Sequence, residues 1–171
     1  MKRILTILIV LTLILSGCAK TPSDDKLSIV VGVYVLEEFA RRIGGHLVDV
    51  VNLVPPGVEA HDFELSAQDR ILLDKSDVLL AIGSSFESWL DEVASGLKDT
   101  LVVRTGDGLM GNESDPHIWL DPMLAKEIAI KIRNALIEKD YENEATYRAN
   151  TQTLIKELEE LDDLFETSLE N

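Results

Sequence analysis

Cysteine is nearly missing from this sequence, with Cys18 the only one among 171 residues. A single cysteine cannot form an intramolecular disulfide, so a packed core rather than a disulfide framework must hold the fold together. It also cannot build a thiolate metal site. Any bound metal ion must therefore be held by nitrogen and oxygen ligands, for which the chain offers three histidines and 31 Asp and Glu side chains.

Basic residues are also scarce. The chain has 16 Lys and Arg against 31 Asp and Glu, which gives a formal charge of −15. Nucleic-acid binding needs a basic face for the phosphates, and no cluster of Lys or Arg provides one, so we exclude nucleic acid as a partner. An acidic surface attracts cations, but it also serves simply to keep a protein soluble, so the charge alone does not identify a metal carrier.

Long apolar runs are equally rare. The one pronounced run, from Ile4 to Leu15, follows Lys2 and Arg3 at the start of the chain. Its length of about 12 residues is well below the roughly 20 helical residues that a bilayer core requires. A positively charged start followed by a short apolar segment predicts that residues 1–17 form a signal peptide.

The residues around Cys18 indicate how this segment is processed. Leu15-Ser16-Gly17-Cys18 resembles the lipobox of bacterial and archaeal lipoproteins, in which the cysteine is lipidated and becomes the mature N-terminus. We therefore expect Cys18 to anchor the protein to the cell membrane on its extracytoplasmic side, periplasmic or extracellular. The polar stretch 18–26 then forms a flexible tether between the membrane and the fold.

From residue 27 onwards, strand and helix patterns alternate and predict an α/β fold. The expected strands are almost continuously apolar, which is typical of a mostly parallel sheet flanked by helices on both faces. The predicted strands are 28–33, 48–54, 78–82 and 101–103. The predicted helices are 36–43, 66–73, 86–97, 121–136 and 143 to the C-terminus.

Capping residues mark two of the helix starts. Ser66 stands three residues before Asp69 in a capping-box arrangement, and Asp121 precedes Pro122 as an N-cap acceptor. The last predicted helix carries a single apolar stripe flanked by acids, and such a stripe must be buried against something. The stripe consists of Tyr147, Leu154, Leu158, Leu161 and Phe165.

The three histidines lie in different settings. His61 is in the loop that follows the carboxyl end of the second predicted strand. Open α/β sheets place their ligand sites at the carboxyl ends of their strands. His117 lies between sheet and helix, with Asp115 and Asp121 near enough in sequence to orient its imidazole. Simple exposure to solvent is the alternative for both loop histidines. His46 follows the end of a helix, where we expect a cation favoured by the helix dipole and not a ligand.

Three segments together resemble the zinc- and manganese-specific substrate-binding lipoproteins of ABC importers. The segments are 53–64 (LVPPGVEAHDFE), 74–83 with Glu87 and Trp89 after it, and 115–122 (DPHIWLDP). The resemblance extends from Ser28 to the last helix in the same order. It implies two α/β lobes joined by one long helix, with the metal held between them by three histidines and a carboxylate or by two of each.

The resemblance implies that His61 and His117 are metal ligands. It also implies that the protein captures Zn²⁺ or Mn²⁺ and delivers it to an importer permease, without enzymatic activity. Residues 27–140 would form the N-terminal metal-binding lobe, and 141–171 the start of the interlobe helix. Because the second lobe is absent from this sequence, we expect capture to be impaired.

Several alternatives stay open. The loop 105–115 has no histidine, unlike the histidine-rich loop of many zinc-specific members, which weakens the zinc assignment without establishing manganese. Glu59 is either an auxiliary oxygen ligand or a solvated loop acid. A metal-dependent hydrolase would use similar ligands, but the sequence has no H-E-x-x-H helix, no nucleophile elbow and no evident general base. An adhesin-type surface lipoprotein is a third class, although no residue pattern here encodes adhesion.

Overall fold

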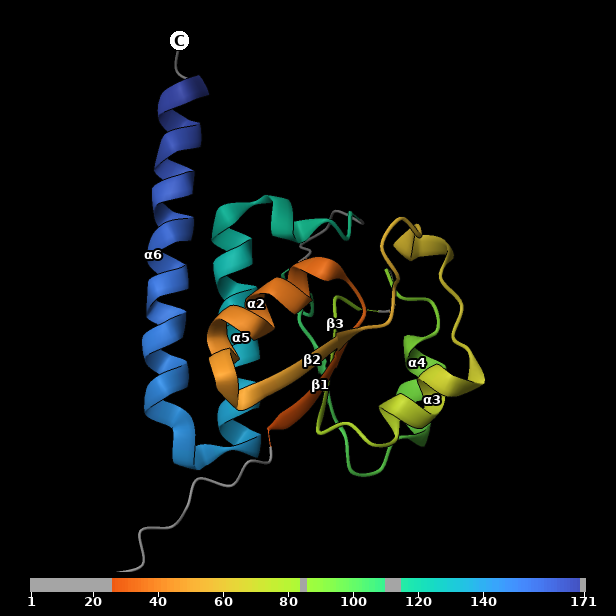
Figure 1. Ribbon diagram of the computed structural model, residues 1–171. Helices are drawn as coiled ribbons and strands as arrows, with labels where there is room; N and C mark the ends of the chain where they lie inside the picture. Colours follow the sequence, from red (N-terminus) through yellow and green to blue (C-terminus); the bar gives the residue numbers. More distant parts are fainter. Residues whose placement is uncertain (1–25, 84–85, 110–114, 170–171) are drawn as a thin grey trace, which may run out of the picture.

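The computed structural model describes residues 26–83, 86–109 and 115–169. Within these ranges four strands form one parallel sheet in the order β2-β1-β3-β4 (Figure 1). The strands are β1 (Leu27–Val31), β2 (Val48–Asn52), β3 (Val78–Ala81) and β4 (Leu101–Arg104). The predicted signal peptide, Cys18 and nearly all of the predicted tether lie outside the described residues.

Helices cover both faces of this sheet, so the predicted α/β class with a parallel, flanked sheet is confirmed. One face carries α2 (Tyr34–Gly44), α5 (Pro122–Lys139) and α6 (Glu144–Leu169). The opposite face carries α3 (Ala67–Leu73) and α4 (Leu90–Gly96) (Figure 1). This arrangement follows from the chain order, because a crossover between parallel strands needs a helix that packs back on the sheet.

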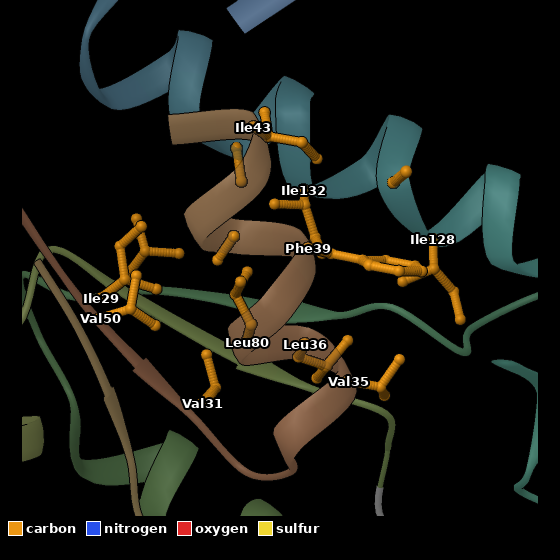
Figure 2. Packing of buried hydrophobic residues seen from close by; sticks show 14 of the residues in the cluster. Ile29, Val31, Val35, Leu36, Phe39, Ile43, Val50, Leu80, Ile128 and Ile132 are labelled. Carbon is orange, nitrogen blue, oxygen red and sulfur yellow. The ribbon is translucent and has the colours of Figure 1, made fainter. Parts of the chain in front are cut away.

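The core is divided by the sheet into two layers, since successive side chains of a strand point to opposite faces. Figure 2 shows Ile29, Val31 and Leu80 directed toward the face covered by α2 and α5, where Phe39 and Ile132 complete the larger cluster. The smaller cluster lies on the other face. It consists of Val30, Leu53, Leu73, Leu79, Ala81, Leu90 and Val93.

Both predicted caps are present. The Ser66 hydroxyl accepts from the Asp69 N–H at 3.2 Å, and Asp69 Oδ2 accepts from the Ser66 N–H at 2.8 Å, which closes a reciprocal capping box. Asp121 Oδ1 accepts from the backbone N–H groups of Met123 at 2.8 Å and Leu124 at 3.1 Å. The start of α5 is thereby fixed directly after the segment that carries the third histidine of the sequence.

The predicted start of the third helix, at residue 86, is wrong. Instead of beginning near Phe86, α4 begins at Leu90. The Gly83 carbonyl accepts from the N–H groups of Phe86 at 2.8 Å and Glu87 at 2.9 Å, and the Glu87 side chain folds back onto the end of β3. These contacts make a turn where the apolar spacing alone predicted helix.

The stripe on α6 is buried over only part of its length. Tyr147 and Leu154 are buried in the larger cluster and Leu158 packs against it, whereas Leu161 and Phe165 are exposed. The packing partners are α2 and α5, beyond which the C-terminal part of α6 extends (Figure 1). Neither α6 nor any other helix in the described ranges has the length and apolar content needed to cross a membrane.

Candidate metal centre

The carboxyl ends of all four strands lie at one edge of the sheet because the strands run parallel. The segment after β2 leads to a 3₁₀ turn at Ala60–Asp62, which carries His61. His117 directly precedes a second such turn at Ile118–Leu120, whose end is fixed by the N-cap of α5. Two loops far apart in sequence therefore meet where open α/β sheets place their ligands.

The structure brings His61 and His117 together, as the sequence predicted for a shared site. Their Nε2 atoms are 3.3 Å apart, and the ring centroids are 5.3 Å apart with an interplanar angle of 70°. Both imidazoles thus direct the same ring nitrogen toward one point. This pair, His61 and His117, is called the histidine pair below.

The spacing of the histidine pair fits two ligands of one metal ion. Zinc binds histidine nitrogen at about 2.0–2.1 Å in a tetrahedral arrangement, which separates two ligating nitrogens by about 3.3–3.4 Å. The observed 3.3 Å between the Nε2 atoms falls at this value. A cation between the rings would need little movement of either loop.

Asp115 orients one member of the pair. Its Oδ1 atom lies 2.6 Å from His117 Nδ1 and accepts from the His117 backbone N–H at 3.0 Å. Both contacts hold the pKa of Asp115 below its ordinary value, and the hydrogen bond from the backbone N–H has the larger effect. An ionised Asp115 keeps the proton of neutral His117 on Nδ1, so that the Nε2 lone pair faces the histidine pair.

His117 Nε2 is an acceptor in that tautomer. Ligation through both Nε2 atoms requires that the Nε2 atom of His61 also carries no proton. Asp121, also considered as an orienting carboxylate, does not have this role, because its carboxylate caps α5 instead.

An aromatic wall supports the histidine pair. The ring of Phe86 lies 4.4 Å from that of His61 and 5.8 Å from that of His117, between centroids. Trp119 lies 5.2 Å from His117 and 5.3 Å from Phe86. Apolar spacing predicted Phe86 as part of a helix and not of the site, although its place just after β3 is another strand end at the same edge.

Glu87 directly follows Phe86, and the sequence predicted no role for it in the site although it is part of the family resemblance. Only 1% of its surface is exposed, and its two carboxylate oxygens accept from the N–H groups of Ile82 at 3.1 Å and Gly83 at 2.9 Å. Burial raises the pKa of Glu87 to about 7, although these backbone hydrogen bonds act in the opposite direction. A buried carboxyl with so shifted a pKa next to a candidate site indicates a supporting role.

The histidine pair has no third ligand in place. Within residues 26–83, 86–109 and 115–169, no group of three or more His, Cys, Asp or Glu side chains is arranged to hold a metal ion. Glu59 is therefore not grouped with the pair. His46 lies in the turn Gly45–Leu47 that follows the C-terminus of α2, away from the edge where the strands end.

The fold and the pair define an α/β lobe with a partial nitrogen-donor site at the carboxyl edge of its sheet. Residues 29–171 match the family described as "Zinc-uptake complex component A periplasmic". The match extends over most of the sequence, and the chain belongs to this family.

Three similar proteins show how widely the family's metals vary. The iron-binding protein YfeA of Yersinia pestis is 28% identical, over 82% of this chain and 49% of its own length. The manganese-binding lipoprotein MntA of Halalkalibacterium halodurans is 31% identical, over 92% and 56%. The zinc-bound ZnuA-like domain of Streptococcus pneumoniae AdcA superposes with a TM-score of 0.76 at 28% identity, over 81% and 54%. The chain thus spans about half the length of the curated relatives it matches.

Proposed function

We propose that this chain captures a divalent metal ion outside the cytoplasm and delivers it to the permease of an ABC importer. The observation that carries the proposal is the convergence of the two Nε2 atoms at 3.3 Å. Family membership supports the transport role, because the family is named for a component of a zinc-uptake complex and not for an enzyme. Transport needs no chemistry on the ion, only reversible ligation.

His61 and His117 are the proposed ligands, with Asp115 orienting His117 from behind. Neutral imidazole nitrogens replace part of the water around the ion, and the remaining coordination positions are filled by water or by donors from elsewhere. Zn²⁺ and Mn²⁺ are the proposed cargo. The spacing of the histidine pair suits tetrahedral zinc, and the relatives named for manganese and iron justify testing Mn²⁺ beside it.

Titration calorimetry of the full chain with Zn²⁺ and with Mn²⁺ tests this proposal. We expect His61→Ala and His117→Ala each to weaken binding by more than the 10- to 100-fold that is typical for loss of a residue behind a ligand, and Asp115→Ala to fall within about that range. His46→Ala is the matched control and should bind like the parent. Binding should also weaken as the pH is lowered, because protons compete with the metal ion for its ligands. Equal affinity in the parent, His61→Ala and His117→Ala would remove the histidine pair from the site.

We also propose that Cys18 carries the lipid anchor. The support is the lipobox-like sequence and the lipoprotein names of relatives such as MntA. Several acyl chains hold a protein stably on a membrane, whereas one chain gives only marginal binding. Cell fractionation should find Cys18→Ser in the soluble fraction and the control Ser23→Ala with the membranes. A membrane-bound Cys18→Ser protein would contradict the anchor.

Finally, we propose that residues 27–140 are one metal-binding lobe and that 141–171 begin a helix leading to a second. The 3₁₀ turn Tyr141–Asn143 separates α5 from α6, and the exposed Leu161 and Phe165 give α6 an apolar face beyond the first lobe. Reading the DNA beyond codon 171 tests the division. A frame that encodes another α/β lobe would support it, and the lack of such a frame would remove it.

A further inference from the structure

The turn between β3 and α4 joins the two central strands of the sheet to the aromatic wall. We propose that Glu87 is a positioning residue, which holds the histidine pair at its 3.3 Å separation by fixing Phe86 against both imidazoles. This inference rests on the proposed function of the pair as a metal site. The carboxyl group of Glu87 contacts the backbone of Ile82 and Gly83. Through Phe86 it nevertheless controls how well the two imidazoles bind an ion.

The first step is the clamp that Glu87 makes at the end of β3. Each of its carboxylate oxygens accepts one backbone N–H, from Ile82 at 3.1 Å and from Gly83 at 2.9 Å. The same carboxylate lies against Gly32 at the end of β1, where an added Cβ would be 2.5 Å from Glu87 Oε1. One side chain thus binds the end of one central strand and closely packs against the end of the other.

The second step leads from the clamp to the rings. Phe86 precedes Glu87 directly, and the N–H groups of both residues donate to the Gly83 carbonyl. Phe86 is buried, so its ring has little room to adjust independently of this backbone. Because that ring contacts His61 and His117 at once, a displaced turn displaces the wall on which both imidazoles rest.

The third step concerns why the residue is a carboxylate. The comparable contact at the end of the adjacent strand β4 is made by a neutral side chain. The hydroxyl of Thr105, the residue after β4, donates to the Ala81 carbonyl at 2.9 Å. A neutral side chain therefore suffices to close a strand end in this sheet. Burying Glu87 is unfavourable, as its raised pKa shows, but its two oxygens accept from two neighbouring N–H groups, whereas the hydroxyl of Thr105 makes one contact to a carbonyl. These two hydrogen bonds define the position of the turn.

Two measurements on the full chain test the proposal. The first is the NMR shift of the imidazole ring protons of His61 and His117 without metal, which responds to the ring current of Phe86. The second is Zn²⁺ affinity by calorimetry. Glu87→Gln keeps the size of the side chain but replaces one acceptor by an NH₂ group, so we expect altered imidazole shifts and about tenfold weaker Zn²⁺ binding, the lower end for loss of a residue behind the ligands.

Thr105→Val is the matched control, because it also removes a buried side-chain hydrogen bond at the end of a strand. It should keep the imidazole shifts and the Zn²⁺ affinity of the parent. A folded Glu87→Gln protein that matches the parent in both measurements would overturn the proposal. If Glu87→Gln does not fold, Phe86→Leu keeps the clamp and removes only the ring, and unchanged Zn²⁺ affinity in that variant would equally overturn it.

The two levels of inference fail separately. A parent chain that does not bind Zn²⁺ or Mn²⁺ contradicts the proposed function, whatever Glu87 does. In that case the imidazole shifts of Glu87→Gln still decide whether the clamp sets the geometry of the histidine pair. A parent that binds Zn²⁺ while Glu87→Gln leaves both shifts and affinity unchanged contradicts the clamp alone.

Discussion

Glu87 makes the stability of this lobe depend on pH in the direction opposite to that of most carboxylates. Its pKa rises from 4.5 to about 7, mainly because burial disfavours the charged form. The hydrogen bonds from the N–H groups of Gly83 and Ile82 lower the pKa but do not cancel this effect. Between these values the folded chain keeps a proton that the unfolded chain has released. The contribution of Glu87 to stability is therefore fully present below pH 4.5 and is lost as the pH rises through about 7.

The size of the effect follows from the two pKa values. At 1.36 kcal/mol per pH unit, the interval between 4.5 and about 7 corresponds to about 3 kcal/mol in the free energy of unfolding. Most of this, about 2–3 kcal/mol, falls between pH 5 and pH 8. Such a change is a large part of a typical domain stability of about 5 to 15 kcal/mol.

Urea denaturation of the parent and of Glu87→Gln at pH 5 and pH 8 measures this contribution. All other titratable groups are the same in the two proteins, so the comparison isolates position 87. We expect the parent to lose about 2–3 kcal/mol more than Glu87→Gln between the two pH values. Identical pH dependence in the two proteins would refute the reasoning, because it would mean that Glu87 titrates alike in the folded and unfolded chains.

Four further substitutions test the packing that supports the site, each by urea denaturation. Leu154→Ala should cost about 2–5 kcal/mol because Leu154 is 1% exposed, whereas Leu164→Ala, 60% exposed on the same helix, should stay within about 0.5 kcal/mol; equal effects would contradict the packing of α6. Asp121→Ala removes the N-cap of α5 and should cost about 1 kcal/mol, and an unchanged midpoint would speak against the cap. Gly32→Ala places a Cβ 2.5 Å from Glu87 Oε1 and should destabilise the chain by about 1–3 kcal/mol, so parent-like stability would show that the clamp yields easily.

Much of the fold could be predicted because its signals are local. The nearly continuous apolar strands predicted a sheet with helices on both faces, and the capping residues Ser66 and Asp121 act within three residues of themselves. The start of α4 could not be predicted in this way. Phe86 has apolar spacing that suits a helix, and only the side chain of Glu87, folded back onto the end of β3, makes it part of a turn.

The site was predictable in its ligand candidates but not in its support. His61 and His117 follow strands whose carboxyl ends must share an edge, so their convergence could be expected. Sequence spacing could not separate the roles of Asp115 and Asp121, both of which lie within four residues of His117. The structure shows that the first binds the imidazole and the second caps a helix. The partial burial of α6 likewise depends on how far α2 and α5 extend beside it.

The aromatic wall also gives the protein an optical reporter of its own site. The chain has two tryptophans. Trp119 stacks edgewise on His117 with the ring centroids 5.2 Å apart, close enough for a cation on the imidazole to change the electric field at the indole. Trp89 packs against the smaller core cluster on the other side of the sheet. A change in tryptophan emission on adding an ion can therefore be assigned by replacing Trp89 with Phe, which leaves Trp119, beside the histidine pair, as the single tryptophan.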